Sequence, residues 1–439
     1  MRQGKFEKLL LIPTAGAPFD ISDLVAEVSI YQDLFSHYMT CELVLRDAIS
    51  ISRSIPANEE ELLNGGLTGG ELLIMQYYSE NDPMITNCFA MYSRSARTKE
   101  SDTTEVFILS GISLEAFDAF PRKISRAFGG QNGNEIHKMV ESVVREFLYS
   151  RNTRDVYSGI LKDFKALIEK QVIVEETSGK HRFVIPNLSV DDTIDFFANE
   201  ADSPDHIPQY LFYENYYGFN FWNLGTLAQG NPVMEYIYTE YNIDPSDTDK
   251  TKITSYTVKK ENNLLKNAKS GLFGSKIIAI DMIKKKKTET VFDYNKEFKK
   301  FKTLQPYKQK GTSHPDVNVT MMTTRMGHDC SCPQLGLENH LPKRIDHFLG
   351  ARRSYTNHIM NTMLSVMVPG TTSLNVGDTV LLKFPIKNAL TDSKEVILDK
   401  DLSGKYIITK LRNKFNGIGD KSSFITVFEC IKDTQIQES

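Results

Sequence analysis

Residues 374–385 read LNVGDTVLLKFP, in which a glycine and an acid lead into an apolar run. Residues 68–78, near the other end of the chain, read TGGELLIMQYY, with glycine, acid and apolar strand in the same order. Glycine gives the backbone the freedom that a tight entry into a strand requires, and an acid favours the turn. The two stretches indicate two similar β-rich units, although generic reuse of such turns by small β-barrels is an equally open explanation.

Alternating strands extend the similarity on both sides of each turn. Period-two alternation of apolar and polar residues is typical of a strand with one buried face. The N-terminal set comprises TCELVLRD (40–47), GGELLIMQYY (69–78) and TTEVFILSGIS (103–113), and the C-terminal set comprises NTMLSVMVPG (361–370), VGDTVLLKFP (376–385), GKYIITKLR (404–412) and SFITVFECIKD (423–433). Short strands with this punctuation predict a small antiparallel barrel or sandwich at each end.

The middle of the chain changes to a helical period. Apolar residues of 134–147 recur at spacings of three and four, which predicts a helix with Asn134 as its cap. The stretch 189–201 begins with capping-box spacing and predicts a second helix, and 160–170 predicts a third. The aromatic-rich residues 210–222 predict a β-hairpin whose turn ends at Gly218.

These patterns predict a mainly β fold with α+β insertions, namely two tube-like antiparallel β-barrel domains plus lateral helix-containing domains. The first barrel is expected over 1–118 and a lateral α+β domain over 119–250. The second barrel is expected to be discontinuous, over 251–287 and 356–439. A lysine-rich lateral domain with few strong strands is expected between them, over 288–355.

Length and charge bound the class of protein. A chain of 439 residues is too long for one hydrophobic core and predicts two to four domains. A net charge of −4 gives no global field that would gather nucleic acid or an anionic membrane. Five scattered cysteines predict reduced thiols. The apolar stretch 9–12 is too short for a signal peptide and no segment is long enough to span a membrane, so we expect a soluble protein made in the cytoplasm.

Several stretches, taken in order, resemble a known family. They are VAEVSIYQDLFSHYMTCELVLRD (25–47), PRKISRAFGG (121–130), IPNLSVDDTIDFFANEA (185–201), YLFYENYYGFNF (210–221), NNLLKNAKSGLFGSKIIAIDMIKK (262–285), VPGTTSLNVGDTVLLKFP (368–385), SGKYIITKLRNKF (403–415) and FECIKD (428–433). Their order and spacing resemble the baseplate hub proteins of contractile-tailed bacteriophages, which are similar to the N-terminal part of type VI secretion spike (VgrG) proteins. None of the stretches is a chemical motif with fixed residues.

The resemblance implies a homotrimer in which each subunit contributes two tube-like barrels. Three chains would then present six similar units to a hexameric tail tube while keeping the three-fold symmetry of a spike. The implied partners are the tail tube protein, the spike protein and other baseplate proteins, with DNA only as cargo passing through the lumen and no membrane insertion by this chain. The implied location is the tail baseplate of a virion assembled in the host cytoplasm. The sequence stops at Ser439, after the last expected strand, so the spike is expected to be a separate protein.

Candidate chemical sites are few, and each has a structural explanation that we favour. His328, Cys330 and Cys332, with His340 and His347 beyond, are the residues worth testing as a metal site, but a loop with incidental thiols is the preferred interpretation. The acidic residues Asp244, Asp247 and Asp249 lack the glycine and glutamate of a calcium loop, which favours a solvated turn.

Three other stretches have features of binding surfaces. GLFGSK (271–276) has the wrong spacing to cradle phosphate and is expected to end a helix at Gly271 and start a strand. Between Lys284 and Lys310, lysines alternate with aromatic residues in a pattern that single-strand binders use, although a solvated face that contacts a partner is favoured. The aromatic residues interleaved there are Phe292, Tyr294, Phe298 and Phe301. The hairpin Tyr210–Trp222 could stack a sugar or base, but core packing is favoured.

No catalytic, cofactor-binding or metal residue is therefore assigned, and the chain is not expected to be an enzyme. The first hypothesis is a structural hub of a phage baseplate. A hub of a phage-like secretion or injection particle is the alternative from the same machinery. A tail-associated cell-wall hydrolase is the alternative from another class, and the absence of a paired acid and nucleophile motif argues against it.

Overall fold

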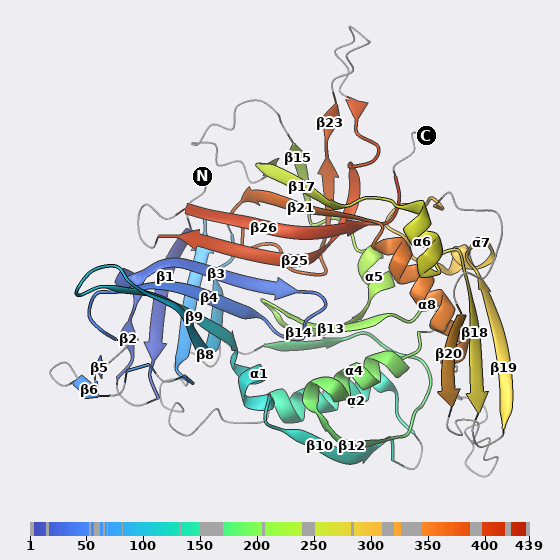
Figure 1. The fold of residues 1–439 in the computed structure, drawn as a ribbon, viewed down its shortest axis with the longest axis horizontal. Coiled ribbons are helices and arrows are strands. Elements are labelled where there is room, and N and C mark those ends of the chain that lie inside the picture. Colours follow the sequence, from blue (N-terminus) through green and yellow to red (C-terminus); the bar gives the residue numbers. More distant parts are fainter. Residues whose placement is uncertain are drawn as a thin grey trace, which may run out of the picture.

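The computed structural model describes residues 4–435 except for 15–16, 52–53, 57–61, 65, 68, 81, 131–132, 150–169, 204–206, 239–250, 282–284, 310–319, 326–344, 387–396 and 418–422. The fold is mainly β, as expected, with helix-containing parts that lie to the side of a large sheet (Figure 1). None of the described helices combines the length and the apolar character needed to cross a membrane.

The N-terminal part of the large sheet is an antiparallel set of strands with one short helix. Its elements are β1 (Gly4–Ile12), β2 (Phe19–Asp20), η1 (Ser22–Leu24), β3 (Val25–Asp33), β4 (Thr40–Asp47), β7 (Leu72–Ser79), β8 (Ile85–Lys99) and β9 (Glu105–Ser113). Neighbours in the sheet follow the order β2–β1–β7–β8–β9–β4–β3. A small hairpin, β5 (Ser54–Pro56) with β6 (Leu62–Asn64), lies between β4 and β7 in the chain. We refer to this set as the N-terminal half.

The C-terminal half repeats that arrangement. Its strands are β15 (Met234–Tyr238), β16 (Lys252–Ile253), β17 (Ser255–Lys260), β21 (Thr362–Pro369), β22 (Thr379–Lys383), β25 (Gly404–Asn416) and β26 (Ser423–Lys432). The neighbours follow the order β16–β15–β22–β25–β26–β21–β17, so each strand occupies the place of its counterpart in chain order. The difference is β15, which runs parallel to β22, whereas its counterpart β1 runs antiparallel to β7.

The two ends of the strand order in the C-terminal half are consecutive in the chain. β17 continues β16 after a single residue, Thr254, whose N–H also donates to Met367 of β21 at 2.8 Å. Because β16 and β17 do not pair with each other, the described strands of this half do not form the closed barrel that the sequence predicts. In the N-terminal half, β2 and β3 occupy the corresponding positions but are separated by η1.

The two glycine-acid turns have the same conformation and the same hydrogen bonds. Gly70 and Gly377 have φ of 89° and 87°, a left-handed region that glycine adopts most readily. The Gly70 N–H donates to the carbonyl of Met91 at 2.6 Å, and the Met91 N–H donates to the carbonyl of Glu71 at 2.8 Å. Each turn thereby ties the start of one strand to a neighbouring long strand.

The corresponding contacts in the C-terminal half are equivalent. The Gly377 N–H donates to the carbonyl of Ile408, and the Ile408 N–H donates to the carbonyl of Asp378, both at 2.9 Å. A β-bulge directly follows both long-strand residues, between Met91 and Ser93 in β8 and between Ile408 and Lys410 in β25. The repeat is thus a structural duplication, and chance reuse of a common turn does not account for it.

Two further groups of elements are inserted around the halves. The lateral group contains α1 (Leu114–Ala119), β10 (Lys123–Phe128), α2 (Ile136–Val143), the π-helical η2 (Val144–Tyr149), β11 (Gln171–Val174), β12 (Phe183–Ser189), α4 (Val190–Glu200), β13 (Tyr210–Asn215), β14 (Gly218–Asn223) and α5 (Leu224–Gln229). The second group lies between β17 and β21 and contains α6 (Leu264–Ser270), β18 (Gly274–Asp281), β19 (Lys286–Asp293), α7 (Tyr294–Glu297), η4 (Phe298–Lys300), β20 (Thr320–Arg325) and α8 (Ile345–Ile359). The short strands β23 (Pro385–Ile386) and β24 (Ile397–Leu398) pair with each other.

Several local predictions are confirmed. Ser189 caps α4 by accepting the Asp192 N–H at 3.1 Å, as the capping-box spacing predicts. α6 ends at Gly271 in the left-handed conformation and β18 begins three residues later. The hairpin over 210–222 is β13 with β14.

Other local predictions need correction. The cap of α2 is Glu135 and not Asn134, whose side chain instead accepts the Glu135 N–H at 3.0 Å. The helix α8 is not among the predicted elements, whereas the strand expected over 361–370 is present as β21, which begins at Thr362. The helix expected over 160–170 lies outside the described residues except for Lys170.

We expect Gly377→Ala to lower the free energy of unfolding by more than Gly417→Ala. Both glycines have positive φ, which costs about 1 kcal/mol or more for alanine. A Cβ at 377 would also lie 2.7 Å from the Tyr213 hydroxyl, whereas at 417 it would meet nothing within 4 Å. Chemical denaturation of the two variants gives the comparison, and equal losses would contradict the close packing of this turn.

Candidate functional site: the junction between the two halves

The two halves are joined by direct strand pairing between β3 and β25. Seven residue pairs form this antiparallel ladder, from Lys410 opposite Asp33 to Asn416 opposite Glu27. Backbone hydrogen bonds at both ends extend it, because the Leu34 N–H donates to Thr409 and the Gly417 N–H donates to Ala26, each at 2.8 Å. The fourteen strands of the two halves therefore belong to one continuous sheet (Figure 1).

Side chains on one face of this ladder carry opposite charges on the two strands. Lys410 lies 3.1 Å from Asp33, and Lys414 lies 2.8 Å from Glu27. Arg412 contacts the same Glu27 at 3.2 Å and donates to the Ser29 hydroxyl at 3.0 Å. A hydrogen bond from Lys410 to Asp33 and the charge of that carboxylate raise the pKa of Lys410. Pairs with this much solvent exposure stabilise weakly, so they set the register more than they hold the halves together.

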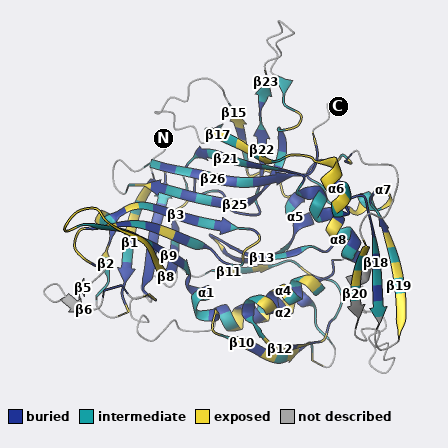
Figure 2. Cartoon of the chain, in the orientation of Figure 1, coloured by how far each residue is buried: buried dark blue, intermediate teal, exposed yellow. Residues whose placement is uncertain are grey.

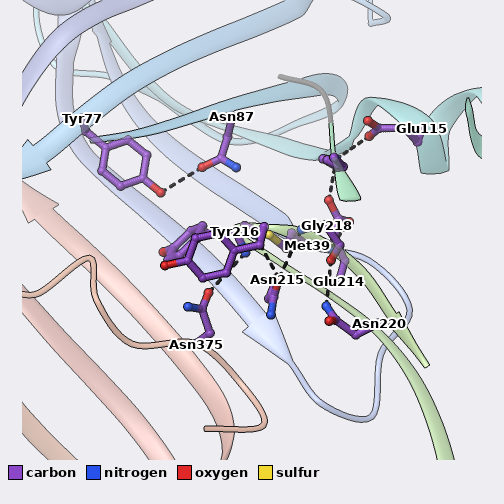
Figure 3. Close-up of polar contacts among 12 residues, drawn as sticks. Met39, Tyr77, Asn87, Glu115, Glu214, Asn215, Tyr216, Gly218, Asn220 and Asn375 are labelled. Carbon is purple, nitrogen blue, oxygen red and sulfur yellow. Dashed lines mark hydrogen bonds and ion pairs between the residues drawn. The ribbon is translucent and has the colours of Figure 1, made fainter. Parts of the chain in front are cut away.

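A buried tyrosine at the tip of the β13–β14 hairpin links the two halves (Figure 3). Tyr216 packs against Tyr77 of β7, with ring centroids 6.3 Å apart, and accepts a hydrogen bond from the Asn413 side chain of β25 at 2.7 Å. Its backbone N–H donates to Asn375, in the residues before the second glycine-acid turn, at 3.3 Å. The hairpin therefore contacts both halves at their junction.

A buried ion cluster attaches the same hairpin to the N-terminal half. Lys170 contacts Glu115 of α1 and lies 2.5 Å from Glu214 of β13. The other Glu214 oxygen accepts the backbone N–H of Met39 at 2.9 Å (Figure 3). Burial by itself lowers the pKa of Lys170, but the two carboxylates outweigh burial and raise that pKa, so the lysine stays charged. The cluster fixes β13 relative to the loop between β3 and β4.

A second polar contact links this loop to α4. His37 lies 2.9 Å from Asp195 and 3.7 Å from Asp191. Tyr38 donates a hydrogen bond to Asp191 at 2.5 Å. Burial lowers the pKa of His37, but hydrogen bonds and charges of the two aspartates raise it from 6.5 to about 9. His37 is therefore a cation at neutral pH and holds the lateral helix against the N-terminal half.

The structure places the sequence-derived candidate residues as follows. His328, Cys330, Cys332, His340, Asp244, Asp247 and Asp249 lie outside the described residues, and His347 lies in α8 with a side chain that is not described. Cys41, Cys88 and Cys430 are buried free thiols. Within the described ranges, no group of three or more His, Cys, Asp or Glu residues is arranged to hold a metal ion.

The aromatic residues of the lysine-rich stretch pack inward. Tyr294 is fully buried, and Phe292 and Phe301 are nearly so. The ring of His358 from α8 lies 5.8 Å from that of Tyr294 and 5.7 Å from that of Phe301. In the 210–222 hairpin, Tyr210, Phe212, Phe219 and Phe221 are likewise buried. Most of both sets is therefore core, while Tyr217 of the hairpin is 52% exposed and Phe298 is half-buried.

The residues of the junction were not singled out from the sequence. One signal for the pairing was available, because KLRNK (410–414) places three basic residues on one face of a strand and AEVSIYQD (26–33) places two acidic residues on one face of another. The partners of Tyr216 and Lys170 are distant in sequence, and no local pattern indicates them.

Comparison with known proteins supports the expected resemblance. The chain is 24% identical over 237 residues to the probable baseplate hub protein gp334 of Vibrio phage KVP40, and the match covers 52% of this chain and 53% of that protein. The chain thus matches only about half the length of that relative. No family model matches the chain.

Solved structures that resemble this chain include tail proteins. The 43 kDa tail protein of prophage MuSo2 from Shewanella oneidensis has a TM-score of 0.50 at 10% identity, with 97% of each chain covered. A tail protein from Neisseria meningitidis MC58 has a TM-score of 0.49 at 10% identity, also with 97% of each chain covered. The relative in sequence confirms the resemblance to phage baseplate hub proteins, and the fold is similar to that of the prophage tail protein.

We expect Lys170→Met to lower the free energy of unfolding by about 3 to 5 kcal/mol, because it leaves the buried Glu214 carboxylate without its charge partner. The double variant Lys170→Met/Glu214→Gln should recover part of the loss, since the amide oxygen can still accept the Met39 N–H. Chemical denaturation of the three proteins measures both effects. A double variant no more stable than Lys170→Met would contradict the charge-pair assignment.

We expect a stability term that depends on His37 and disappears at alkaline pH. The folded pKa of about 9 exceeds the ordinary value of 6.5, so the stabilisation is complete below about pH 6.5 and is lost as the pH rises through 9. It amounts to at most about 3 kcal/mol. Thermal unfolding between pH 6 and 10 should show this slope in the unmodified protein and lack it in His37→Gln. An unchanged slope in the variant would rule the histidine out as its source.

Proposed function

We propose that this chain is a baseplate hub subunit of a contractile phage tail, in which three copies form a ring of six similar halves. Such a ring would join a hexameric tail tube to a trimeric spike and form part of the channel for DNA ejection. The observation that carries the proposal is the duplication, with the same strand order and the same turn hydrogen bonds in both halves.

The duplication would allow one chain to match two partners of different symmetry. A hexameric tube presents six equivalent contact surfaces, and a trimeric spike presents three. Three copies of a chain with two similar units present six similar surfaces, which match the six-fold symmetry of the tube approximately. The same three copies match the three-fold symmetry of the spike strictly. The β3–β25 ladder supports this role because it fixes one half relative to the other within the chain.

The polar face of the sheet supports a channel. Glu27, Asp33 and Glu42 lie on the same face as Lys410, Arg412 and Lys414 around the junction. Mixed charge of this kind offers no continuous positive track, so DNA would pass without being held. DNA is thus proposed as passing cargo and not as a bound ligand.

The other parts of the proposal follow from the same role. The chain would be a structural protein and not an enzyme, located in the tail baseplate of the virion and assembled in the host cytoplasm. Its partners would be two further copies, the tail tube protein, the spike protein and other baseplate proteins. The division into 1–118, 119–250, 251–287 with 356–439, and 288–355 would assign most of the first and third parts to the ring and most of the other two to its periphery. The exceptions are β15 of the second part, which belongs to the C-terminal half, and α6 and β18 of the third part, which belong to the second inserted group.

Size-exclusion chromatography with light scattering tests the assembly. We expect a mass of three times the 49.9 kDa of one chain. Averaged electron micrographs of the same sample should show six similar lobes around one axis. A mass that stays at one chain at every concentration reached, or particles with three lobes only, would contradict the proposed ring.

A further inference from the structure

The junction between the two halves of one chain is the ladder of β3 with the later part of β25. The first part of β25 pairs with β22 on one edge, and from Lys410 onward that edge is taken over by β3. β26 covers the opposite edge along almost the whole strand. One long strand thus pairs first with its own half and then with the other half.

The counterparts of these two strands lack the equivalent joint. β8 corresponds to β25, and β7 covers its edge only as far as Ala90, while β9 covers the opposite edge up to Lys99. β17 corresponds to β3 and pairs with β21 on one edge. Among the described strands, none pairs with the second edge of β17 or with that edge of β8 beyond the bulge at 91–93. Residues 92–99 are all exposed, and this second part of β8 projects from the sheet (Figure 2).

The ladders define which residues of β8 are equivalent to those of the joint in β25. Glu429 lies opposite Lys410, and its counterpart Ser110 lies opposite Ser93. Four residues further along β25, Lys414 lies opposite Ile425. The counterpart of Ile425 is Val106, which lies opposite Thr98, so Thr98 is the counterpart of Lys414.

The same procedure gives the equivalent residues of β17. Glu42 lies opposite Ser29 and its counterpart Ser365 lies opposite Thr257, so Thr257 is the counterpart of Ser29. Continuing past the end of β17 makes Asn262 the counterpart of Asp33.

An independent feature shows that the two exposed edges fit each other. β8 contains a bulge between Ser95 and Thr98 that β25 lacks, and β17 contains a bulge between Val258 and Lys260 that β3 lacks. Each strand therefore has one extra residue, and the two extra residues fall at the same level. A ladder with Ser93 opposite Asn262 and Thr98 opposite Thr257 consequently runs without a break. Neither bulge has such a complement within the chain.

We infer that β8 of one copy pairs antiparallel with β17 of the next copy, in the register that places Ser93 opposite Asn262 and Thr98 opposite Thr257. The inference rests on the proposed ring and specifies its interface. The contact is head-to-tail, because one copy contributes β8 and its neighbour contributes β17, and such contacts form a ring where the rotation between copies closes. It would also cover two strand edges that would otherwise be open to aggregation.

Side chains around this interface suit a partner. Tyr92 is 53% exposed beside the start of the β8 edge, and Leu265 is 74% exposed shortly after β17. In the inferred register Arg94 lies opposite Glu261, which gives an oppositely charged cross-strand pair. At the junction within the chain, Leu34 is fully buried next to the β3–β25 ladder. In the inferred interface, Asn263 occupies the position equivalent to Leu34.

Cysteine pairs test the register directly. Residues directly opposite each other in antiparallel strands have Cα atoms about 4.5 to 5.5 Å apart, within the range that a disulfide spans. In a background with Cys330 and Cys332 changed to serine, we expect Ser93→Cys/Asn262→Cys and Thr98→Cys/Thr257→Cys to form cross-linked dimers and trimers on oxidation. The exchanged pairs, Ser93→Cys/Thr257→Cys and Thr98→Cys/Asn262→Cys, carry cysteines on the same strands and serve as matched controls that should not cross-link. Non-reducing gel electrophoresis gives the readout.

The outcomes separate this inference from the proposed function. If light scattering shows a trimer but the two matched pairs do not cross-link, the inference is overturned and the trimeric hub stands. Cross-linking of the exchanged pairs would also overturn the register. If the matched pairs cross-link but the mass is not that of a trimer, the strand pairing stands and the ring of three fails. In the unmodified protein, amide hydrogen exchange at 93–99 and 255–260 should slow on assembly, and unchanged exchange there would overturn the pairing without any variant.

Discussion

The ladder between β3 and β25 is the constraint on which the rest of the structure depends. A sheet that passes from one half into the other through shared backbone hydrogen bonds cannot rotate at that point without breaking them. The Tyr216 hairpin and the Lys170 cluster add side-chain contacts around the same place. Insertions of very different character can therefore attach to the halves without altering the angle between them.

The buried polar groups at the junction favour specificity over raw stability. Replacing a buried ion cluster by apolar side chains is often neutral or stabilising, so Lys170 and its two glutamates are weak evidence for a strong fold. They nevertheless require one arrangement of α1, β13 and the loop after β3, because any other leaves a charge unsatisfied. A protein that repeats a structural unit needs such constraints, since similar strands could otherwise pair with the wrong partner.

The sequence predicted the parts of this structure that depend on local pattern. The alternating strands, the Ser189 cap and the end of α6 at Gly271 all follow from the residues within a few positions of each feature. The glycine-acid turns indicated the duplication because a left-handed φ limits the choice of residue. The helix α8 is not evident from the sequence because Gly350, Arg352 and Arg353 interrupt its apolar period between Leu349 and Tyr355.

The junction itself could not be predicted in the same way. Its bonds join residues that are far apart in the chain, such as Asn413 with Tyr216, and a single sequence carries no signal for such pairs. The packing of the lysine-rich stretch could not be predicted either, because its aromatic residues fill a core that α8 completes.

The reversed direction of β15 has a consequence for the polarity of any closed assembly. Because β1 and β15 run in opposite directions relative to their neighbours, the polypeptide enters the two halves at opposite rims of the sheet. Chain entries would therefore alternate up and down around the circumference. A partner that touches only the body of the sheet would meet six near-identical facets, whereas one that touches the strand entrances on a single rim would meet a three-fold pattern. The two ends of such a ring would be chemically distinct, although both are built from the same repeated unit.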